Sequence, residues 1–97
     1  MSHDWSQWLD FDRATVEAVP ELPGVCVMHA GMKILYIGGS QNVRQDLLTK
    51  LSNPCTANAK RFKYLVTSAF KVVKEEQVKE YVSKHGRLPP CMEQNAL

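Results

Sequence analysis

Two short apolar runs, separated by only two residues, constrain the fold more than any other feature of the chain. The runs are Gly24–Ala30 (GVCVMHA) and Lys33–Gly38 (KILYIG), and only Gly31-Met32 lies between them. This spacing predicts an antiparallel β-hairpin, because a parallel pair needs a crossover of a dozen residues or more. Both runs carry apolar side chains on both faces, which predicts a sheet that is covered on both sides.

The remaining periodicities predict one further strand and three helices. Arg61–Thr67 (RFKYLVT) alternates between apolar and polar side chains and predicts a third strand. Helices are predicted over Asp12–Val19, from a cap at Ser40 or Asn42 to Leu51, and over Lys71–Lys84 with a stop at Gly86.

The predicted fold class is therefore α/β (α+β), with a three-stranded antiparallel sheet flanked by helices in the order α-β-β-α-β-α. The prolines within Leu88–Cys91 predict an extended tail. The chain has 97 residues, which suits a single domain over residues 1–97 with a core at about residues 11–92. An aromatic segment, residues 1–11, precedes that core, and its Trp5 and Trp8 are expected to close the core or to form a homodimer contact.

Composition narrows the class of protein. The hydrophobic fraction of 44% and the charged fraction of 23% are near the globular average, which argues against disorder. No apolar run is long enough to cross a bilayer, so no membrane partner is expected. Residues 1–5 lack the features of a signal peptide, and a cytoplasmic location is expected by default.

Charge is distributed unevenly along the chain. Five of the ten acidic residues lie in the first 21 positions, whereas from Lys33 onward eleven basic residues accompany five acidic ones. A basic surface of this kind can attract phosphates or can simply be solvated. The candidate nucleic-acid-binding residues are Arg44, Lys60, Arg61, Lys63 and Lys74, with Lys71 beside them.

The three cysteines, Cys26, Cys55 and Cys91, are widely spaced and form no Cys-x-x-Cys pair. Reduced, partly buried thiols are therefore expected for them. The alternative is a metal site in which Cys55 joins His85 and Cys91.

Two motifs carry a resemblance to a known family. The first is Pro23-Gly24-Val25-Cys26-Val27, and the second is the segment from Leu35 to Arg44 (LYIGGSQNVR). Together with the β-β-α context, and with the ending Tyr81 to Cys91, they resemble the GIY-YIG endonuclease family, in particular its small stand-alone branch. The resemblance covers about residues 11–92 and implies a DNA-repair-like nuclease fold.

The resemblance implies a set of catalytic positions. In such enzymes two tyrosines hold or deprotonate the attacking water, an arginine on the first helix stabilises the phosphate, and a glutamate on the last helix binds a divalent cation, usually magnesium. Here these positions carry Cys26 and Tyr36 for the tyrosines and Asp46 for the arginine. Arg44 lies about 200° around the helix from Asp46, so a role at the edge of the buried stripe is expected for it, or a backbone contact to nucleic acid.

The glutamate position has several candidates in this sequence. One register puts Lys74 there, and another points to Lys79 or Glu80. Glu75 is the best remaining metal ligand, and the asparagine expected near the end of the family pattern is Met92. Of the family's set, only Tyr36 is retained.

Three functions follow from these departures. The first is a catalytically impaired GIY-YIG domain that binds DNA or RNA through its basic face. The second is a protein-interaction or structural module, and the third is an active magnesium-dependent endonuclease that uses Tyr36 with Glu75 or Glu80. The first is preferred, because losing several catalytic groups together leaves little rate enhancement.

Overall fold

The predicted hairpin lies at the centre of the fold in the computed structural model, which describes residues 5–95. The elements in chain order are β1 (Leu9–Asp10), α1 (Arg13–Glu17), β2 (Gly24–Ala30), β3 (Lys33–Ser40), α2 (Val43–Leu51), a short 3-10 helix η1 (Thr56–Asn58), β4 (Arg61–Val66), α3 (Phe70–His85) and α4 (Pro90–Asn95). Residues 1–4 of the predicted aromatic segment and residues 96–97 of the predicted domain lie outside the described residues.

Over residues 5–95 the sheet has four antiparallel strands in the order β1-β4-β2-β3, so the three strands expected from the sequence are one too few. The additional strand, β1, has two residues, and its Leu9 lies opposite Phe62 of β4. A strand this short shows no alternation in the sequence, because two residues cannot establish a period of two. β1 becomes a strand because its backbone pairs with β4.

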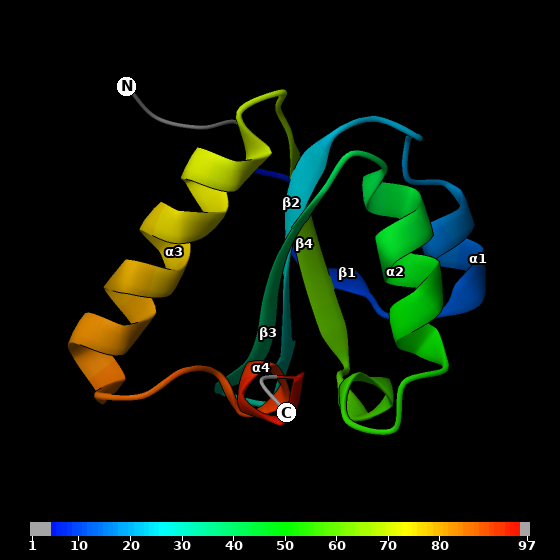
Figure 1. Cartoon of the computed structure of the whole chain (residues 1–97). Coiled ribbons are helices and arrows are strands. Elements are labelled where there is room, and N and C mark those ends of the chain that lie inside the picture. The colour runs from blue at the N-terminus through cyan, green and yellow to red at the C-terminus, as the bar shows by residue number, and fades with distance from the viewer. Residues whose placement is uncertain (1–4, 96–97) are drawn as a thin grey trace.

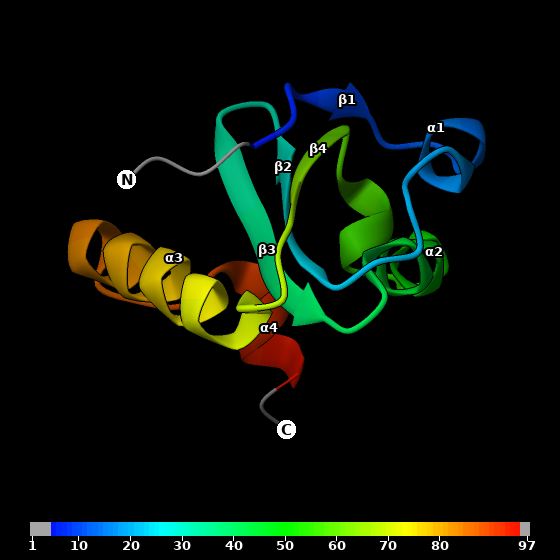
Figure 2. The same ribbon diagram turned by 90° about the horizontal axis from the view of Figure 1, so that it is seen from above.

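The sheet is covered on both faces, as the hairpin residues predict. Figure 1 shows α3 on one side of the sheet and α1 with α2 on the other, and Figure 2 shows the same three layers from above. Successive residues of β2 point to opposite faces, so Val25 and Val27 belong to one apolar cluster whereas Cys26 and Met28 belong to the other. β2 therefore supplies buried side chains to both halves of the core.

Helix ends agree with the sequence signals to within a few residues. The side chain of Asn42 accepts a hydrogen bond from the Gln45 amide at 3.0 Å and caps α2, while Gly86 ends α3 with a φ of 75°. The predicted buried stripe of α2 is confirmed, because Val43 and Leu47 are fully buried and Leu51 is half-buried.

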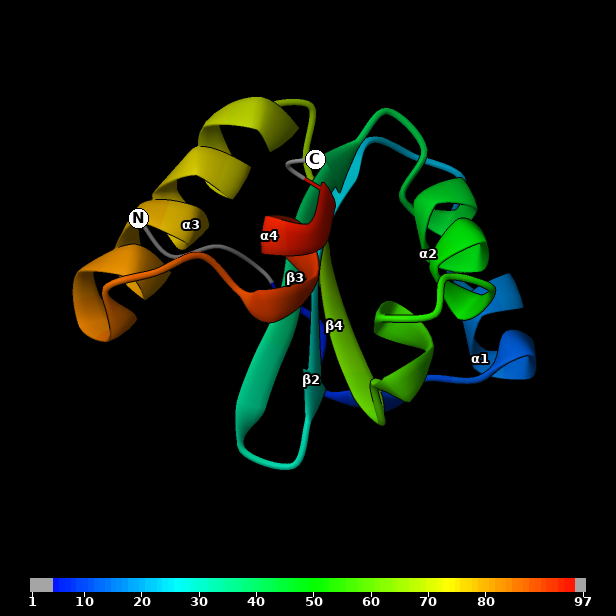
Figure 3. The same cartoon turned by 60° about the horizontal axis from the view of Figure 1, so that its bottom comes forward.

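The C-terminal segment differs from the predicted extended tail, because Pro90 and Cys91 are helical. Pro90 is the first residue of α4, a position where proline is favoured because its missing amide proton would have no partner there. Helix α4 packs on β3, the edge strand of the sheet (Figure 3). Its Met92 contacts both apolar clusters.

Cys55 and Cys91 form a disulfide, so the expectation of reduced thiols is wrong for these two residues. Their Cα atoms lie 5.7 Å apart, across 36 positions in the sequence. Cys26 is a free, buried thiol, as expected. Within residues 5–95, the structure contains no group of three or more His, Cys, Asp or Glu side chains that could hold a metal ion, and the proposed Cys55–His85–Cys91 site is not formed.

No helix in the described part of the chain has the length and apolar character needed to cross a membrane.

Reducing the disulfide should lower the free energy of unfolding by about 3–4 kcal/mol, because the cross-link restricts the unfolded chain over a loop of 36 residues. Urea unfolding with and without dithiothreitol measures this difference. An unchanged midpoint, together with the mass of a fully reduced chain before treatment, would contradict the pairing.

Candidate functional site

The register of the hairpin brings Tyr36 and Cys26 to the same face of the sheet. Tyr36 lies opposite Met28, and Gly38 lies opposite Cys26, so Tyr36 and Cys26 are diagonal neighbours. Both belong to the apolar cluster beneath α1 and α2, where Cys26 is completely buried and Tyr36 is 9% exposed. The two positions that the resemblance assigns to tyrosines are thus adjacent in this fold.

Gly38 makes room for the Tyr36 ring. A methyl group added at Gly38 would overlap the phenol of Tyr36, with its Cζ only 2.7 Å away. The phenol therefore lies flat over Gly38 and is directed toward Cys26, the residue paired with Gly38. The absence of a side chain at position 38 thus serves the tyrosine two residues before it.

Asp46 reaches the same place from α2. The Cys26 thiol donates a hydrogen bond to the Asp46 carboxylate, with an Sγ–Oδ2 distance of 3.8 Å. Asp46 lies three residues after Val43, which is fully buried, so the helix turns its carboxylate toward the sheet. Cys26, Tyr36 and Asp46, the positions that the family resemblance implied to be catalytic, consequently form one cluster.

Lys50 completes this cluster, and sequence reasoning did not identify it. Its Nζ lies 3.3 Å from an Asp46 carboxylate oxygen and 4.9 Å from the centre of the Tyr36 ring. Both charged side chains are largely buried, with 17% and 15% of their surfaces exposed. The signal that could have found Lys50 is its position four residues after Asp46, one helical turn away on the same face.

Electrostatics keep the two titratable hairpin groups in their neutral forms. Burial raises the pKa of the Cys26 thiol well above its ordinary value, and the Asp46 carboxylate raises it further. Burial and the same carboxylate raise the pKa of the Tyr36 phenol. Neither group is a thiolate, a phenolate or a base near neutral pH.

The cluster can therefore do little of what phosphodiester cleavage requires. A scissile phosphate needs positive charge beside it, whereas Asp46 presents a carboxylate whose charge Lys50 already compensates. An attacking water needs a proton acceptor, and the raised pKa of Tyr36 works against that role. What the cluster does is join β2, β3 and α2 through hydrogen bonding, ion pairing and ring packing.

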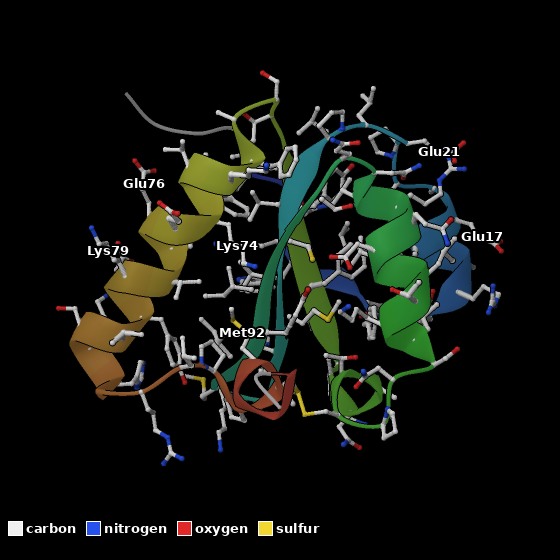
Figure 4. All side chains as sticks on the ribbon, viewed as in Figure 1. Glu17, Glu21, Lys74, Glu76, Lys79 and Met92 are labelled. Carbon is white, nitrogen blue, oxygen red and sulfur yellow. A yellow bond between two sulfur atoms is a disulfide. The ribbon has the colours of Figure 1, made fainter. Side chains whose placement is uncertain are left out.

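Helix α3 presents a different surface, a groove shared with α4. Its lining consists of three lysines, one acidic residue and an apolar floor: Lys71, Lys74, Lys79, Glu75, Val78 and Met92. In Figure 4 Lys74 extends from α3 toward the sheet, whereas Lys79 lies on the outer side of that helix. The stem of Lys74 packs on β3, since a methyl group on Gly39 would lie 3.4 Å from the Lys74 Cβ.

The predicted metal ligand, Glu75, is exposed and lines this groove, whereas Tyr36, Cys26 and Asp46 do not. Lys74 and Met92 were expected, from the resemblance, at the family's glutamate and asparagine positions, and both line the same groove. An ammonium and a thioether are poor ligands for magnesium, which prefers carboxylate oxygens. These residues do not fit a magnesium ion.

The other predicted nucleic-acid-binding residues are dispersed. Arg44 donates to the carbonyl of Val19 at 2.6 Å and pairs with Glu21 at 3.3 Å, so it has the structural role at the helix edge that the sequence indicated. Arg61 pairs with Asp10 at 3.3 Å, across strands β4 and β1.

Lys60 is exposed at the start of β4, and Lys63 is half-buried further along it. The Lys63 Nζ lies 4.9 Å from the ring centre of Trp5 and 5.0 Å from that of Trp8. The two tryptophans thus pack against their own sheet, and the homodimer contact predicted through them stays a prediction.

Comparison of the chain with known protein families, curated proteins and solved structures finds no match in any of the three.

Replacing Gly38 with alanine should lower the free energy of unfolding by about 1–3 kcal/mol, because the new methyl group overlaps the Tyr36 ring. A double-mutant cycle with Tyr36→Ala, read by urea unfolding, isolates the cause. In the Tyr36→Ala background the alanine at position 38 should cost much less. Equal losses of unfolding free energy in both backgrounds would show that Gly38 is needed for its backbone conformation and not to make room for the Tyr36 ring.

Stability should fall above pH 10, and Tyr36→Phe should reduce that fall. The Tyr36 pKa is raised on folding above its unfolded value of about 10, so the folded state retains a proton that the unfolded state releases. The stabilisation is full below pH 10 and is lost as the pH rises through the higher folded pKa. Urea unfolding at pH 8 and pH 11 measures the loss of stability in the wild-type chain and in Tyr36→Phe. Equal losses in the two proteins would contradict the assignment of this pH dependence to Tyr36.

Proposed function

We propose that this chain is a GIY-YIG-type domain that has lost cleavage chemistry and binds the phosphate backbone of a nucleic acid in the groove between α3 and α4. The observation that carries the proposal is an inversion of charge. Asp46 stands at the position of the family's phosphate-binding arginine, and Lys74 stands at a position of its metal-binding glutamate.

The first part of the inversion argues against cleavage. The carboxylate of Asp46 accepts from Cys26 and pairs with Lys50, so the place where the family gathers positive charge is electrically balanced here. A phosphate brought to this cluster would meet a carboxylate, a neutral thiol and a neutral phenol. Stabilising the charge of a transition state needs preorganised donors, which this arrangement does not supply.

The second part of the inversion favours binding. Lys71, Lys74 and Lys79 outnumber Glu75 along the groove, and none of the three lysines forms an ion pair with the acidic side chains that the structure describes. Lysine ammonium groups bind phosphates as point charges and release condensed counterions when they do so. The groove is therefore better suited to a polyanion than to a metal ion.

Of the basic residues proposed from sequence, Lys74 and the neighbouring Lys71 line the groove. Arg44, Arg61 and Lys63 are occupied by Glu21, Asp10 and the tryptophans. Exposed ion pairs are weak, so Arg61 can exchange its partner for a phosphate at little cost, but it contributes a single charge. The groove is lined by three lysines.

Removing the groove lysines together, as Lys71→Ala/Lys74→Ala/Lys79→Ala, should weaken binding of a labelled oligonucleotide about tenfold or more. The slope of log affinity against log salt should decrease by about 2 to 3, roughly one for each phosphate contact. Fluorescence anisotropy across a salt series, with single-stranded and duplex probes, measures both quantities.

The matched control is Arg13→Ala/Lys33→Ala/Lys84→Ala, which removes the same charge from exposed positions outside the groove. It should change the affinity much less. Equal losses of affinity in the two variants would show that the oligonucleotide is held by a diffuse electrostatic attraction and not by the groove. Plasmid nicking in magnesium that is abolished by Tyr36→Phe would refute the loss of chemistry.

A further inference from the structure

Helix α4 forms one wall of the lysine groove and is covalently tied to the opposite part of the fold. Met92, on α4, lines the groove together with residues of α3. The adjacent residue, Cys91, is bonded to Cys55, which lies beyond the end of α2 and directly before η1. The disulfide therefore fixes one wall of the groove through Cys55, a residue 36 positions earlier in the chain.

Among the described side chains, α4 is held by the disulfide and by the packing of Met92 beside β3. It contains six residues, and an isolated helix of that length is unstable in water. The connection that precedes it begins at Gly86, whose positive φ ends α3, and runs through exposed Arg87. Pro89 and Cys91 are its buried anchors, and the second of these is the disulfide residue.

We propose that the Cys55–Cys91 disulfide is a redox switch for this groove: its reduction releases α4 and dismantles the wall that carries Met92. The effect on nucleic acid rests on the proposed function, whereas the release of α4 does not. Met92 contacts both apolar clusters, so its departure also uncovers the side of β3 against which α4 packs.

The reductant is a dithiol, such as a protein with a Cys-x-x-Cys pair, and the exchange is balanced. Its thiolate attacks the Cys55 sulfur, because Cys55 is partly exposed whereas Cys91 is 2% exposed. The S–S bond breaks, a mixed disulfide forms, and the Cys91 thiolate leaves and takes up a proton. The second thiol of the reductant then displaces Cys55, so two electrons and two protons pass to the protein.

The expected consequence is local. A 97-residue domain typically has enough stability to remain folded without this cross-link, so β2, β3 and α2 stay in place while α4 detaches. The lysines of α3 then lose the apolar floor supplied by Met92, and Lys74 becomes more accessible. If α4 is docked in about one tenth of the reduced molecules, the apparent affinity for a polyanion falls about tenfold.

The test compares the oxidised chain with the chain reduced by dithiothreitol, first without nucleic acid. Amide hydrogen exchange followed by mass spectrometry should show faster exchange in α4 on reduction and unchanged protection in β2. The rate of Lys74 acetylation should rise relative to Lys63, which is also half-buried but lies beside the tryptophans on β4. Unchanged α4 exchange, or loss of protection throughout the sheet, would overturn the proposal.

The second arm measures anisotropy of a labelled oligonucleotide with both forms. A roughly tenfold loss of affinity on reduction, reversed by reoxidation, supports the switch. Released α4 with undiminished affinity would overturn its coupling to the groove. Absence of binding in both forms would refute the proposed function, while the exchange and acetylation results still decide the switch.

The variant Cys55→Ser/Cys91→Ser serves as control. It should reproduce the reduced chain in exchange and acetylation, and it should not respond to dithiothreitol. A response of this variant to the reductant would show that the wild-type change has another origin, and would overturn the proposal.

Discussion

Burial of β2 on both faces is the constraint on which the structure depends. Its first five residues, from Gly24 to Met28, are all buried, so each face of the strand needs its own layer of helices. The alternation of the strand divides the core into two clusters, one under α1 and α2 and the other under α3. Tyr36, Cys26 and Asp46 lie on the side of α1 and α2, whereas Lys71, Lys74 and Glu75 lie on α3.

The two sides of the sheet differ in their balance of charge. On the α2 side, Asp46 and Lys50 neutralise each other beside a thiol and a phenol whose pKa values are raised by burial. On the α3 side, three lysines surround a single glutamate along an open groove. A balanced, enclosed cluster stabilises the fold, whereas an unbalanced, open groove is available to a ligand of opposite charge.

The disulfide connects these two regions across the edge of the sheet. It ties the segment that follows α2 to the helix that closes the groove beside α3. Small domains gain much of their stability from such cross-links, because their cores are limited in size. Here the cross-link also places Cys91 in the cluster beneath α1 and α2, beside a methionine that contacts both clusters.

Local sequence determined the parts of this protein that depend on local physics. The Gly31-Met32 connection specified the hairpin, the Val43–Leu47–Leu51 repeat specified the buried stripe of α2, and Gly86 specified the end of α3. These features follow from side-chain periods and turn geometry, which a single segment contains. That Cys26, Tyr36 and Asp46 would meet was implied by the family resemblance and not by these local patterns.

Only the tertiary structure decided which distant residues become partners. The pairing of Leu9 with Phe62, the bond between Cys55 and Cys91, and the placement of Glu75 among lysines and away from Tyr36 depend on how the layers are stacked. The sequence predicted thiols and a tail where the fold has a cross-link and a helix. The physical reason is that such contacts join segments tens of residues apart, and no local period or spacing records the path of the chain between them.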